Sequence, residues 1–271
     1  MNSLEPIQNI LVCPGCRGGL RIDAHAVTCL NCKQVYPIHE NIPQFAVYEN
    51  DETTLKDVAQ TSKNNYEQRY EDFEKAKNYN LKYDRKPLKR LSTKREYQIL
   101  KHLLGSQKHC ETMLEIPCGG GRISPQLVPA TDLLIQADVG LGQILYGITK
   151  EKLNIPQVWM TASAFHIPFQ NNSVDAAICI RLSHHLPTYQ QREDLLAELL
   201  RVARRYVVMT FFDFHSIKNR LRRLRQSRPK LTMTLSQVSS IAAQHGATLA
   251  ACPRLSILGS GHRYALMVKS P

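Results

Sequence analysis

The sequence predicts an α/β protein with a doubly wound, mainly parallel, seven-stranded sheet, preceded by a small cysteine-rich ribbon. From residue 112 onward, short apolar runs alternate with helical patterns, which is typical of parallel strands joined by helical crossovers. Before that, four of the eight cysteines fall within twenty residues, in two Cys-x-x-Cys pairs. We therefore expect a ribbon at 1–48, a helical connector or lid at 49–108 and the sheet domain at 109–271.

The two Cys-x-x-Cys pairs predict a metal site. Two such knuckles can place four thiolates tetrahedrally around one zinc ion, which leaves no open position for catalysis. The twelve residues between the pairs suffice for a short hairpin of 20–22 with 26–28. The alternative is a set of buried cysteines without metal, since a reducing compartment disfavours disulfides. The predicted ligands of a structural zinc ion are Cys13, Cys16, Cys29 and Cys32.

The strands and helices of the sheet domain follow from the alternation of apolar runs and helical patterns. The clearest helix is 188–203, and a later helix at 235–244 precedes two strands near 247–255 and 263–269. The short link between those two strands suggests an antiparallel edge of the sheet. The five earlier strands are expected at 112–118, 132–139, 158–163, 174–180 and 205–212.

The loops after the strands carry the predicted ligand site, because ligands of an open parallel sheet bind beyond the carboxyl ends of its strands. The loop after the first strand contains the glycines 119–121, which let the backbone approach a ligand closely. Asp138 ends the second strand, where a carboxylate can accept both hydroxyls of a ribose. A loop shortened for packing and a surface aspartate are the alternatives. A nicotinamide dehydrogenase is less favoured, because residues 121–124 break the G-x-G-x-x-G spacing.

These motifs resemble those of the class I S-adenosylmethionine-dependent methyltransferases, especially the small-molecule, type 11-like group. The resemblance covers about residues 110–212 and rests on the glycine loop, the acid at 138, the stretches 163–169 and 174–180, and a histidine-containing loop. It implies a Rossmann-like methyltransferase fold and S-adenosylmethionine as cofactor. Pro117 stands where the family has its first glycine, and Ser163 where aspartate is usual.

The resemblance also implies roles for the matched residues. The loop 118–121 would hold the methionine portion of the cofactor, with Glu115 orienting it, while Asp138 would bind the ribose. Ser163 and Ala164 would lie beside the adenine. Arg181, His184 and His185 would lie on the floor of the acceptor pocket. The expected cofactor-binding residues are Glu115, Pro117, Cys118, Gly119, Gly121, Asp138, Ser163, Ala164 and Arg181.

A general base is needed only if the methyl acceptor must lose a proton. The candidates follow the fourth and fifth strands of the domain, at the edge where ligands bind. A purely structural role is the alternative for each of them. The candidate catalytic residues are His184, His185 and Asp213, with His215 as a further candidate nearby.

The amino-terminal segment resembles the small zinc-binding subunit that partners tRNA and release-factor methyltransferases. It shares the four cysteines and the ending YPIHENIP at 36–43, similar to that family's Y-P-I-x-x-G-I-P. Asn41 stands where glycine is usual, and asparagine also tolerates a left-handed backbone. The resemblance implies a structural zinc ion in this segment.

Charge is concentrated in one stretch of the chain. The net charge is +12, and residues 201–230 contain ten basic residues and one acid. Such a stretch indicates a polyanionic partner, whereas a solvated helix face is the alternative. Residues 214–225 predict an amphipathic basic helix within a basic insert at 213–234 that borders the acceptor pocket. The residues expected to bind an anionic acceptor are Lys218, Arg220, Arg222, Arg223, Arg225 and Arg228.

We therefore expect a methyltransferase that acts on an anionic acceptor, either RNA or a phosphorylated glycolipid or small molecule. The alternative is a non-catalytic module that binds S-adenosylmethionine and docks partners through its ribbon. Ile217, Leu221 and Leu224 recur at helical spacing, so a peripheral membrane contact is a further expectation. No apolar run approaches the roughly 20 residues needed to cross a bilayer. The start of the chain has no features of a secretory signal, which predicts a cytoplasmic protein.

Overall fold

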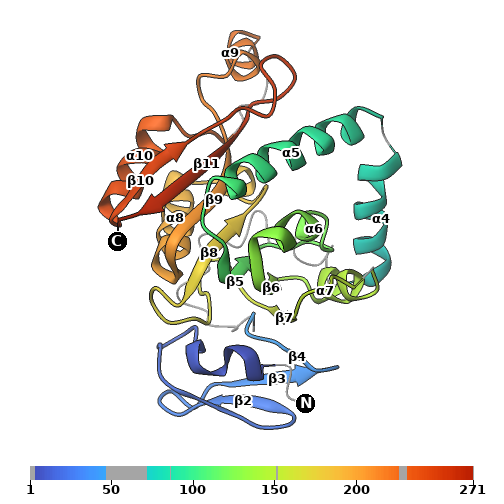
Figure 1. The fold of residues 1–271 in the computed structure, drawn as a ribbon, viewed down its shortest axis with the longest axis vertical. Helices are drawn as coiled ribbons and strands as arrows, with labels where there is room; N and C mark the ends of the chain where they lie inside the picture. The colour runs from blue at the N-terminus through green and yellow to red at the C-terminus, as the bar shows by residue number, and fades with distance from the viewer. Residues whose placement is uncertain (1–3, 47–71, 86, 151, 226–230, 271) are drawn as a thin grey trace.

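The structure of the protein is a computed structural model that describes residues 4–46, 72–85, 87–150, 152–225 and 231–270. Within them, a four-stranded ribbon sheet lies at one end of a larger domain built on a seven-stranded sheet (Figure 1). The predicted ribbon boundary at residue 48 falls outside the described residues. None of the described helices is both long enough and apolar enough to cross a membrane.

The sheet of the larger domain has the predicted doubly wound order. Its strands lie in the order β10-β11-β9-β8-β5-β6-β7. The pairs among β5 to β9 are parallel, and β11 pairs antiparallel with both β9 and β10, so the predicted antiparallel edge is confirmed. The strands are β5 (Cys110–Glu115), β6 (Thr131–Asp138), β7 (Gln157–Thr161), β8 (Val174–Cys179), β9 (Ala203–Phe212), β10 (Ala247–Ala251) and β11 (His262–Lys269).

The predicted strand ends differ from the observed ones by a few residues. β5 ends at Glu115 rather than at Cys118, because Pro117 has no N–H to donate and the glycines turn the chain. β9 begins at Ala203, directly after helix α8, two residues earlier than predicted. The loops that follow the parallel strands β5 to β9 therefore still lie at the carboxyl-end edge of the sheet.

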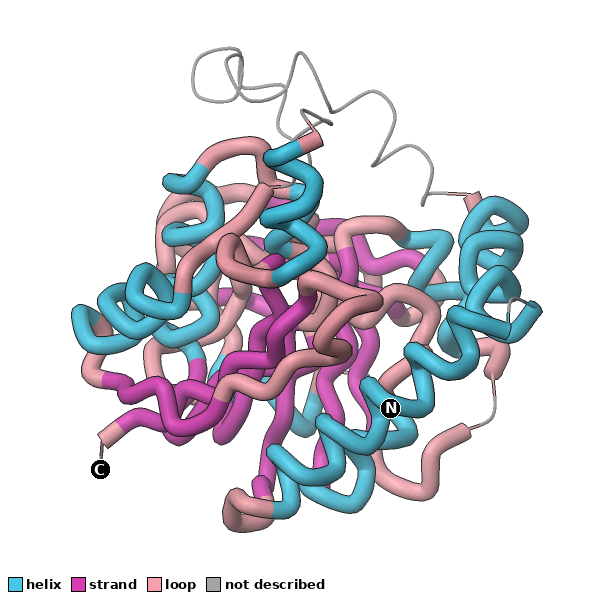
Figure 2. Tube along the Cα trace, turned by 90° about the horizontal axis from the view of Figure 1, so that it is seen from above, coloured by secondary structure: helices cyan, strands magenta, loops and turns pink. Residues whose placement is uncertain are grey.

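Helices cover both faces of the sheet, as Figure 2 shows from above. Apolar side chains of α8 and α10 pack on one face, and those of α5 and α6 pack on the other. α8 begins with a capping box between Thr188 and Gln191, which satisfies its first amide groups. The helices are α4 (Phe73–Arg85), α5 (Pro87–Gly105), α6 (Ser124–Leu127), α7 (Leu141–Ile148), α8 (Tyr189–Val202), α9 (Ile217–Leu224) and α10 (Leu235–Gln244). Short 3-10 turns are η1 (Glu5–Ile10), η2 (Val128–Ala130) and η3 (Ser183–His185).

The ribbon is an antiparallel sheet that packs against the β7 edge of the larger domain. Gln44 forms a parallel bridge with Thr161, and the Phe45 amide donates to the Thr161 carbonyl at 2.9 Å. Leu11 pairs with Phe169, and the buried apolar residues of the two parts form one continuous cluster. Ribbon and domain therefore share a core. The ribbon strands are β1 (Leu20–Ile22), β2 (Ala26–Cys29), β3 (Val35–His39) and β4 (Ile42–Pro43).

Candidate functional site

The glycine loop after β5 is held by the carboxylate that ends β6. Gly119 and Gly121 have φ values of +50° and +71°, a left-handed backbone that glycine adopts without strain. The Gly119 amide donates to Asp138 Oδ2 at 2.9 Å, and the Gly140 amide donates to Oδ1 at 3.0 Å. Asp138 therefore fixes the loops after two neighbouring strands to each other. An ideal Cβ at Gly119 would meet no atom within 4 Å, so its backbone faces open space.

A pocket opens beside this loop, at the carboxyl ends of β5, β6 and β8. Its empty space measures about 750 Å³ when the part that is open to solvent is included. The strand order reverses between β5 and β8, which is where ligands of such sheets bind. Of the expected cofactor-binding residues, the pocket is lined by Glu115, Pro117, Cys118, Gly119, Asp138 and Arg181.

Three expected cofactor-binding residues do not line this pocket. Gly121 instead lines a second cavity, together with Trp159. The Ser163 hydroxyl accepts a hydrogen bond from the Phe165 amide at 3.2 Å, within the loop that follows β7. Ala164 is buried in the core that the ribbon shares. α4 contributes Tyr79 and Asn80 to the pocket wall, which the sequence did not predict.

Two buried carboxyl groups face the pocket, and both have raised pKa values. Burial raises the pKa of Glu115 to about 8, against the lowering effect of the Ser124 hydroxyl that donates to Oε2 at 2.6 Å. Burial likewise raises the pKa of Asp138 to about 6, although backbone amides oppose that rise. Glu115 Oε1 is buried without a hydrogen-bond partner among the described residues. This atom is a polar group that a ligand could satisfy.

A third carboxylate, Glu96 on α5, holds the arginines at the pocket. Arg122 donates to Oε2, Arg181 donates from Nε to Oε1 at 3.1 Å, and the Tyr264 hydroxyl donates to Oε1 at 2.6 Å. Burial alone would raise the pKa of Glu96, but Arg122 and Arg181 lower it to about 2. The carboxylate is therefore ionised at neutral pH. It positions Arg181, whose own backbone has a φ of +67°.

The four ribbon cysteines converge as predicted. Their sulfur atoms all lie within 4.8 Å of one another, with Cys13 Sγ 3.7 Å from Cys32 Sγ and Cys16 Sγ 3.4 Å from Cys29 Sγ. Sulfurs at the corners of a tetrahedral zinc site are about 3.8 Å apart, so the arrangement fits the ion. The Tyr36 hydroxyl lies 3.2 Å from Cys13 Sγ, which supports the cluster from outside.

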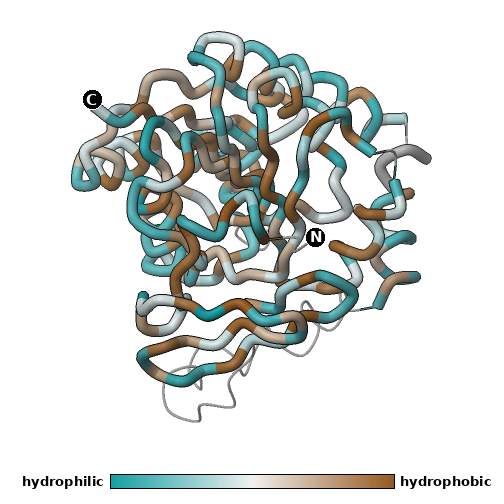
Figure 3. Tube along the Cα trace, turned by 60° about the horizontal axis from the view of Figure 1, so that its bottom comes forward, coloured by the Kyte–Doolittle hydropathy of each residue, from teal (hydrophilic) through white to brown (hydrophobic). Residues whose placement is uncertain are grey.

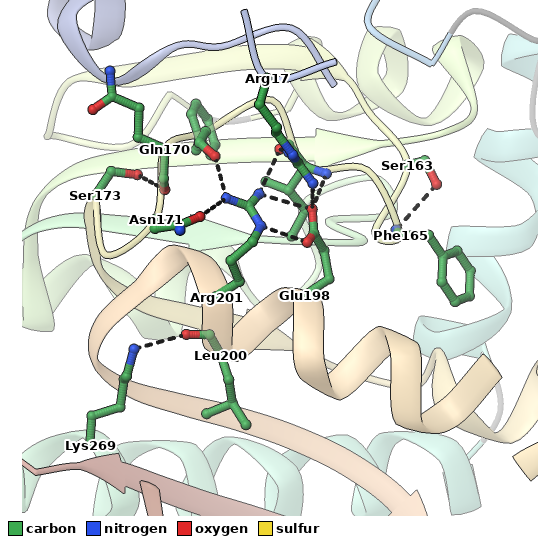
Figure 4. Close-up of polar contacts among 12 residues, drawn as sticks. Arg17, Ser163, Phe165, Gln170, Asn171, Ser173, Glu198, Leu200, Arg201 and Lys269 are labelled. Carbon is green, nitrogen blue, oxygen red and sulfur yellow. Dashed lines mark hydrogen bonds and ion pairs between the residues drawn. The ribbon is translucent and has the colours of Figure 1, made fainter. Parts of the chain in front are cut away.

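The ribbon also contacts the larger domain through one polar cluster, drawn in Figure 4. Arg17 of the ribbon and Arg201 of α8 converge on Glu198, at 2.9 Å and 2.7 Å. Arg17 also donates to the Ile167 carbonyl at 2.6 Å, and the Ile167 amide donates to Glu198 at 2.8 Å. The Val12 amide donates to the Pro168 carbonyl. The loop after β7 is therefore held between α8 and the ribbon.

Family models match both parts of the chain. The model described as a methyltransferase domain matches residues 114–210, and the model described as Trm112p-like protein matches residues 7–41. The chain joins a Trm112p-like zinc ribbon to a methyltransferase domain. The predicted enzyme class and fold are thereby confirmed.

Relatives and solved structures agree with this division. A UPF0434 protein of Francisella tularensis subspecies novicida is 41% identical over 54 residues, which are 19% of this chain and 87% of that protein. Through its ribbon the chain belongs to that family. A magnesium protoporphyrin IX methyltransferase from Synechocystis, solved with bound S-adenosylhomocysteine, is similar in fold with a TM-score of 0.58 at 16% identity, over 68% of this chain and 88% of that one.

Two further structures have the same fold. An N-methyltransferase of Bradyrhizobium japonicum with S-adenosylhomocysteine has a TM-score of 0.54 at 15% identity, over 70% of this chain and 91% of that chain. A complex between the Trm112 methyltransferase activator and a methyltransferase, from Haloferax volcanii, has a TM-score of 0.51 at 10% identity, over 63% of this chain and 88% of that chain.

The candidate catalytic histidines of the methyltransferase domain lie in an aromatic cluster after β8. The ring of His184 lies 4.1 Å from that of His185 and 4.7 Å from that of Phe212, measured between centroids. The His262 ring lies 4.3 Å from Phe212. His184 is half-buried and His185 is exposed. They come three and four residues after Arg181 in the chain, and neither lines the pocket.

Asp213 does not fit the role of a base. Its side chain is fully buried, and Oδ2 accepts a hydrogen bond from Arg263 Nε at 2.7 Å. Oδ1 accepts from the amide of His215, whose own side chain is exposed. Oδ1 therefore holds the turn into α9, whereas Oδ2 pairs with Arg263 of β11. We retain His184 and His185 alone as candidates.

The basic insert contains the predicted helix, α9. Its residues do not line the pocket beside the glycine loop. Arg220, Arg223 and Arg225 are exposed, and Lys218 and Arg222 are half-buried. Arg228 lies outside the described residues.

Proposed function

We propose that the protein transfers a methyl group from S-adenosylmethionine to an anionic acceptor. The observation that carries this proposal is the pocket at the switch point of the sheet, where an open glycine backbone, Asp138 and the unsatisfied Glu115 Oε1 meet. S-adenosylmethionine carries a methyl group on a positively charged sulfur, together with an ammonium group and a ribose. Solved structures of the same fold hold its demethylated product.

The pocket residues fit the groups of this cofactor. Glu115 Oε1 would accept a hydrogen bond from the ammonium group, and the positive charge would favour the ionised form of Glu115. Asp138 would bind the ribose with lone pairs that the Gly119 and Gly140 amides leave unused. The Gly119 backbone faces the pocket with no side chain in the way. Arg181, held by Glu96, would border the transferred group.

For methyl transfer, alignment of the acceptor with the methyl group is required in every case, whereas a general base is required only if the acceptor must lose a proton. Methyl transfer to a nucleophile proceeds in line, so the chain must hold the acceptor opposite the sulfur. His184 and His185 come shortly after the pocket residues Arg181 and Leu182, and in this proposal they would orient the acceptor or remove its proton. The basic residues Lys218, Arg220, Arg222, Arg223 and Arg225 favour an anionic acceptor, either RNA or a phosphorylated glycolipid.

The zinc ribbon would act in cis as the activator of its own methyltransferase domain. Its contacts with Thr161, Ile167, Pro168 and Phe169 fix both ends of the loop that carries Ser163 and Ala164. In the Haloferax complex, a protein named as a methyltransferase activator pairs with a separate methyltransferase. A covalent link makes such pairing independent of protein concentration.

Calorimetry with S-adenosylmethionine and with S-adenosylhomocysteine tests the proposal. We expect both to bind, and Asp138→Ala to weaken binding by about 1–3 kcal/mol, the scale for losing a partner of buried polar groups. Asp132→Ala is the matched control, because Asp132 lies exposed at the other end of the same strand. Equal affinity in the wild type and Asp138→Ala would remove Asp138 from the site, and no binding at all would overturn the proposal.

Transfer of a radioactive methyl group into RNA and lipid fractions then separates an enzyme from a docking module. Cofactor binding without transfer would favour the non-catalytic alternative. The triple variant Arg222→Gln, Arg223→Gln, Arg225→Gln should retain cofactor affinity and bind the acceptor less tightly. If the acceptor is RNA, wild-type binding should fall steeply with salt.

A further inference from the structure

The apolar side chains of α9 are exposed. Leu224, Leu221 and Ile217 have 79%, 46% and 40% of their surface accessible. They recur at positions i, i+4 and i+7, so they form one stripe along the helix. An amphipathic helix on a globular domain ordinarily buries such a stripe. In α9 the stripe instead remains in contact with solvent.

The polar side of α9 is the side that packs on the domain. Asn219 is 4% exposed, and its side-chain amide donates to the Asp213 carbonyl at 2.8 Å. Successive residues of a helix are rotated by about 100°, which places the stripe nearly opposite Asn219. Ser216, also buried, caps the helix by accepting from the Asn219 amide. These contacts hold α9 with its apolar stripe directed away from the domain.

A second apolar segment lies next to α9. Ile257 and Leu258, in the loop between β10 and β11, are 66% and 71% exposed. Lys218 Nζ donates to the carbonyl of Gly259 at 2.8 Å, so this loop is tied to the helix. Figure 1 shows α9 and this loop together at the end of the molecule opposite the ribbon. We define the α9 surface as Ile217, Leu221, Leu224, Ile257 and Leu258.

Positive charge surrounds the α9 surface. Arg220 and Arg225 are exposed and flank the apolar stripe on either side, by the same helical rotation. The guanidinium of Arg223 lies 3.9 Å from the centre of the Phe214 ring. Neither 214–225 nor 252–262 contains an aspartate or glutamate. The surface therefore joins exposed apolar side chains to a field of one sign.

We propose that the α9 surface docks the protein on the surface of an anionic phospholipid membrane. Apolar side chains would enter the boundary between headgroups and acyl chains, and Arg220 and Arg225 would contact lipid phosphates. RNA would use the arginines but would leave Leu224 and Leu258 in water, which is why the structure favours a membrane. This proposal goes beyond methyl transfer and does not depend on it.

The position of the surface gives docking a consequence for the site. α9 follows β9, whose last residue, Phe212, contacts the rings of His184 and His262. The Asp213 amide donates to the Gly261 carbonyl, which joins the turn into α9 to the apolar loop. In a docked molecule, the cluster of His184, His185 and His262 would therefore lie at the end of the molecule that faces the membrane.

Flotation of the full chain with vesicles tests the proposal. The vesicles contain equal parts of phosphatidylcholine and phosphatidylglycerol, and vesicles of phosphatidylcholine alone are the comparison. We expect the wild type to float with the anionic vesicles only. Two double variants should each lower the partition coefficient onto anionic vesicles roughly tenfold. One is Leu221→Ser with Leu224→Ser, and the other is Arg220→Gln with Arg225→Gln.

Matched controls lie on α5, away from the surface. Leu91→Ser removes a leucine that is 67% exposed, and Lys94→Gln with Lys101→Gln removes two exposed positive charges. Both control variants should float like the wild type, and all variants should retain wild-type cofactor affinity in calorimetry. Failure to float, equal loss in the controls, or salt-sensitive binding of RNA that needs the arginines but not the leucines would overturn membrane docking. Loss of cofactor binding with flotation intact would instead count against the proposed function.

Discussion

The ribbon and the methyltransferase domain are stabilised in different ways. The ribbon strands have two to five residues, and hydrophilic and hydrophobic segments alternate along them (Figure 3). The strands of the domain have five to ten residues and carry buried apolar clusters on both faces. A small sheet cannot bury enough surface by itself, so the ribbon depends on its metal and on its partner surface. The domain is stabilised by the burial of its apolar side chains.

Removing a metal ligand should have the largest effect on stability, because the ribbon depends on its zinc ion. Cys29→Ser deletes one of four thiolates, and binding of structural zinc contributes on the order of 10 kcal/mol to folding of such segments. We expect one zinc per chain in the wild type and well below one in the variant. Cys252→Ser, outside the cluster, is the control. Unchanged zinc content in Cys29→Ser would contradict the site.

Raising the pH from about 4 to 8 should destabilise the domain through its two buried carboxyl groups. The folded pKa of Glu115, about 8, lies above its ordinary value of 4.5, so the folded domain binds more protons than the unfolded chain. The free energy of unfolding without cofactor should therefore fall as the pH rises from about 4.5 to 8. Asp138 adds a fall between about 4 and 6.

Glu115→Gln isolates this contribution. The variant should be more stable than the wild type at pH 8, by a few kcal/mol at most, and should have a flatter pH profile. Urea unfolding at a series of pH values measures both. Glu111→Gln, exposed on the same strand, should keep the wild-type profile. A wild-type profile that rises from pH 5 to 8 would contradict the raised pKa.

Glu198 tests how firmly the two regions are joined. Glu198→Ala leaves Arg17, Arg201 and the Ile167 amide without their shared acceptor. Since both arginines are partly exposed, we expect a loss of about 2 kcal/mol, below the full effect of breaking a buried pair. The ribbon should then unfold before the domain in a thermal scan. Asp194→Asn, exposed on the same helix, should leave a single transition.

The smallest effect is expected at Tyr36. Tyr36→Phe removes the hydroxyl beside Cys13 Sγ and keeps the ring against Phe45. Loss of such an outer contact typically lowers metal affinity by about tenfold or somewhat more. Competition with a chromogenic chelator measures the change. An unaltered zinc affinity would show that the hydroxyl plays no part in the site.

The strands and the metal cluster were predictable because their signals are local. Apolar periodicity gave α10 its observed bounds, and Cys-x-x-Cys spacing located the thiolates. The Glu96 cluster had no such signal. Its partners Arg122, Arg181 and Tyr264 lie 26, 85 and 168 residues away, so only the folded topology brings them together. The outward direction of the α9 stripe was equally hidden, because it depends on which face of the helix packs.

The bridge between Gln44 and Thr161 also affects the solubility of the sheet. β7 is a terminal strand of the sheet, and a bare strand edge presents unpaired amides and carbonyls that another chain can join. The Phe45 amide occupies the Thr161 carbonyl and covers the end of that edge. A chain shortened to remove its first 46 residues would present β7 uncovered, and self-association through strand addition is the expected result.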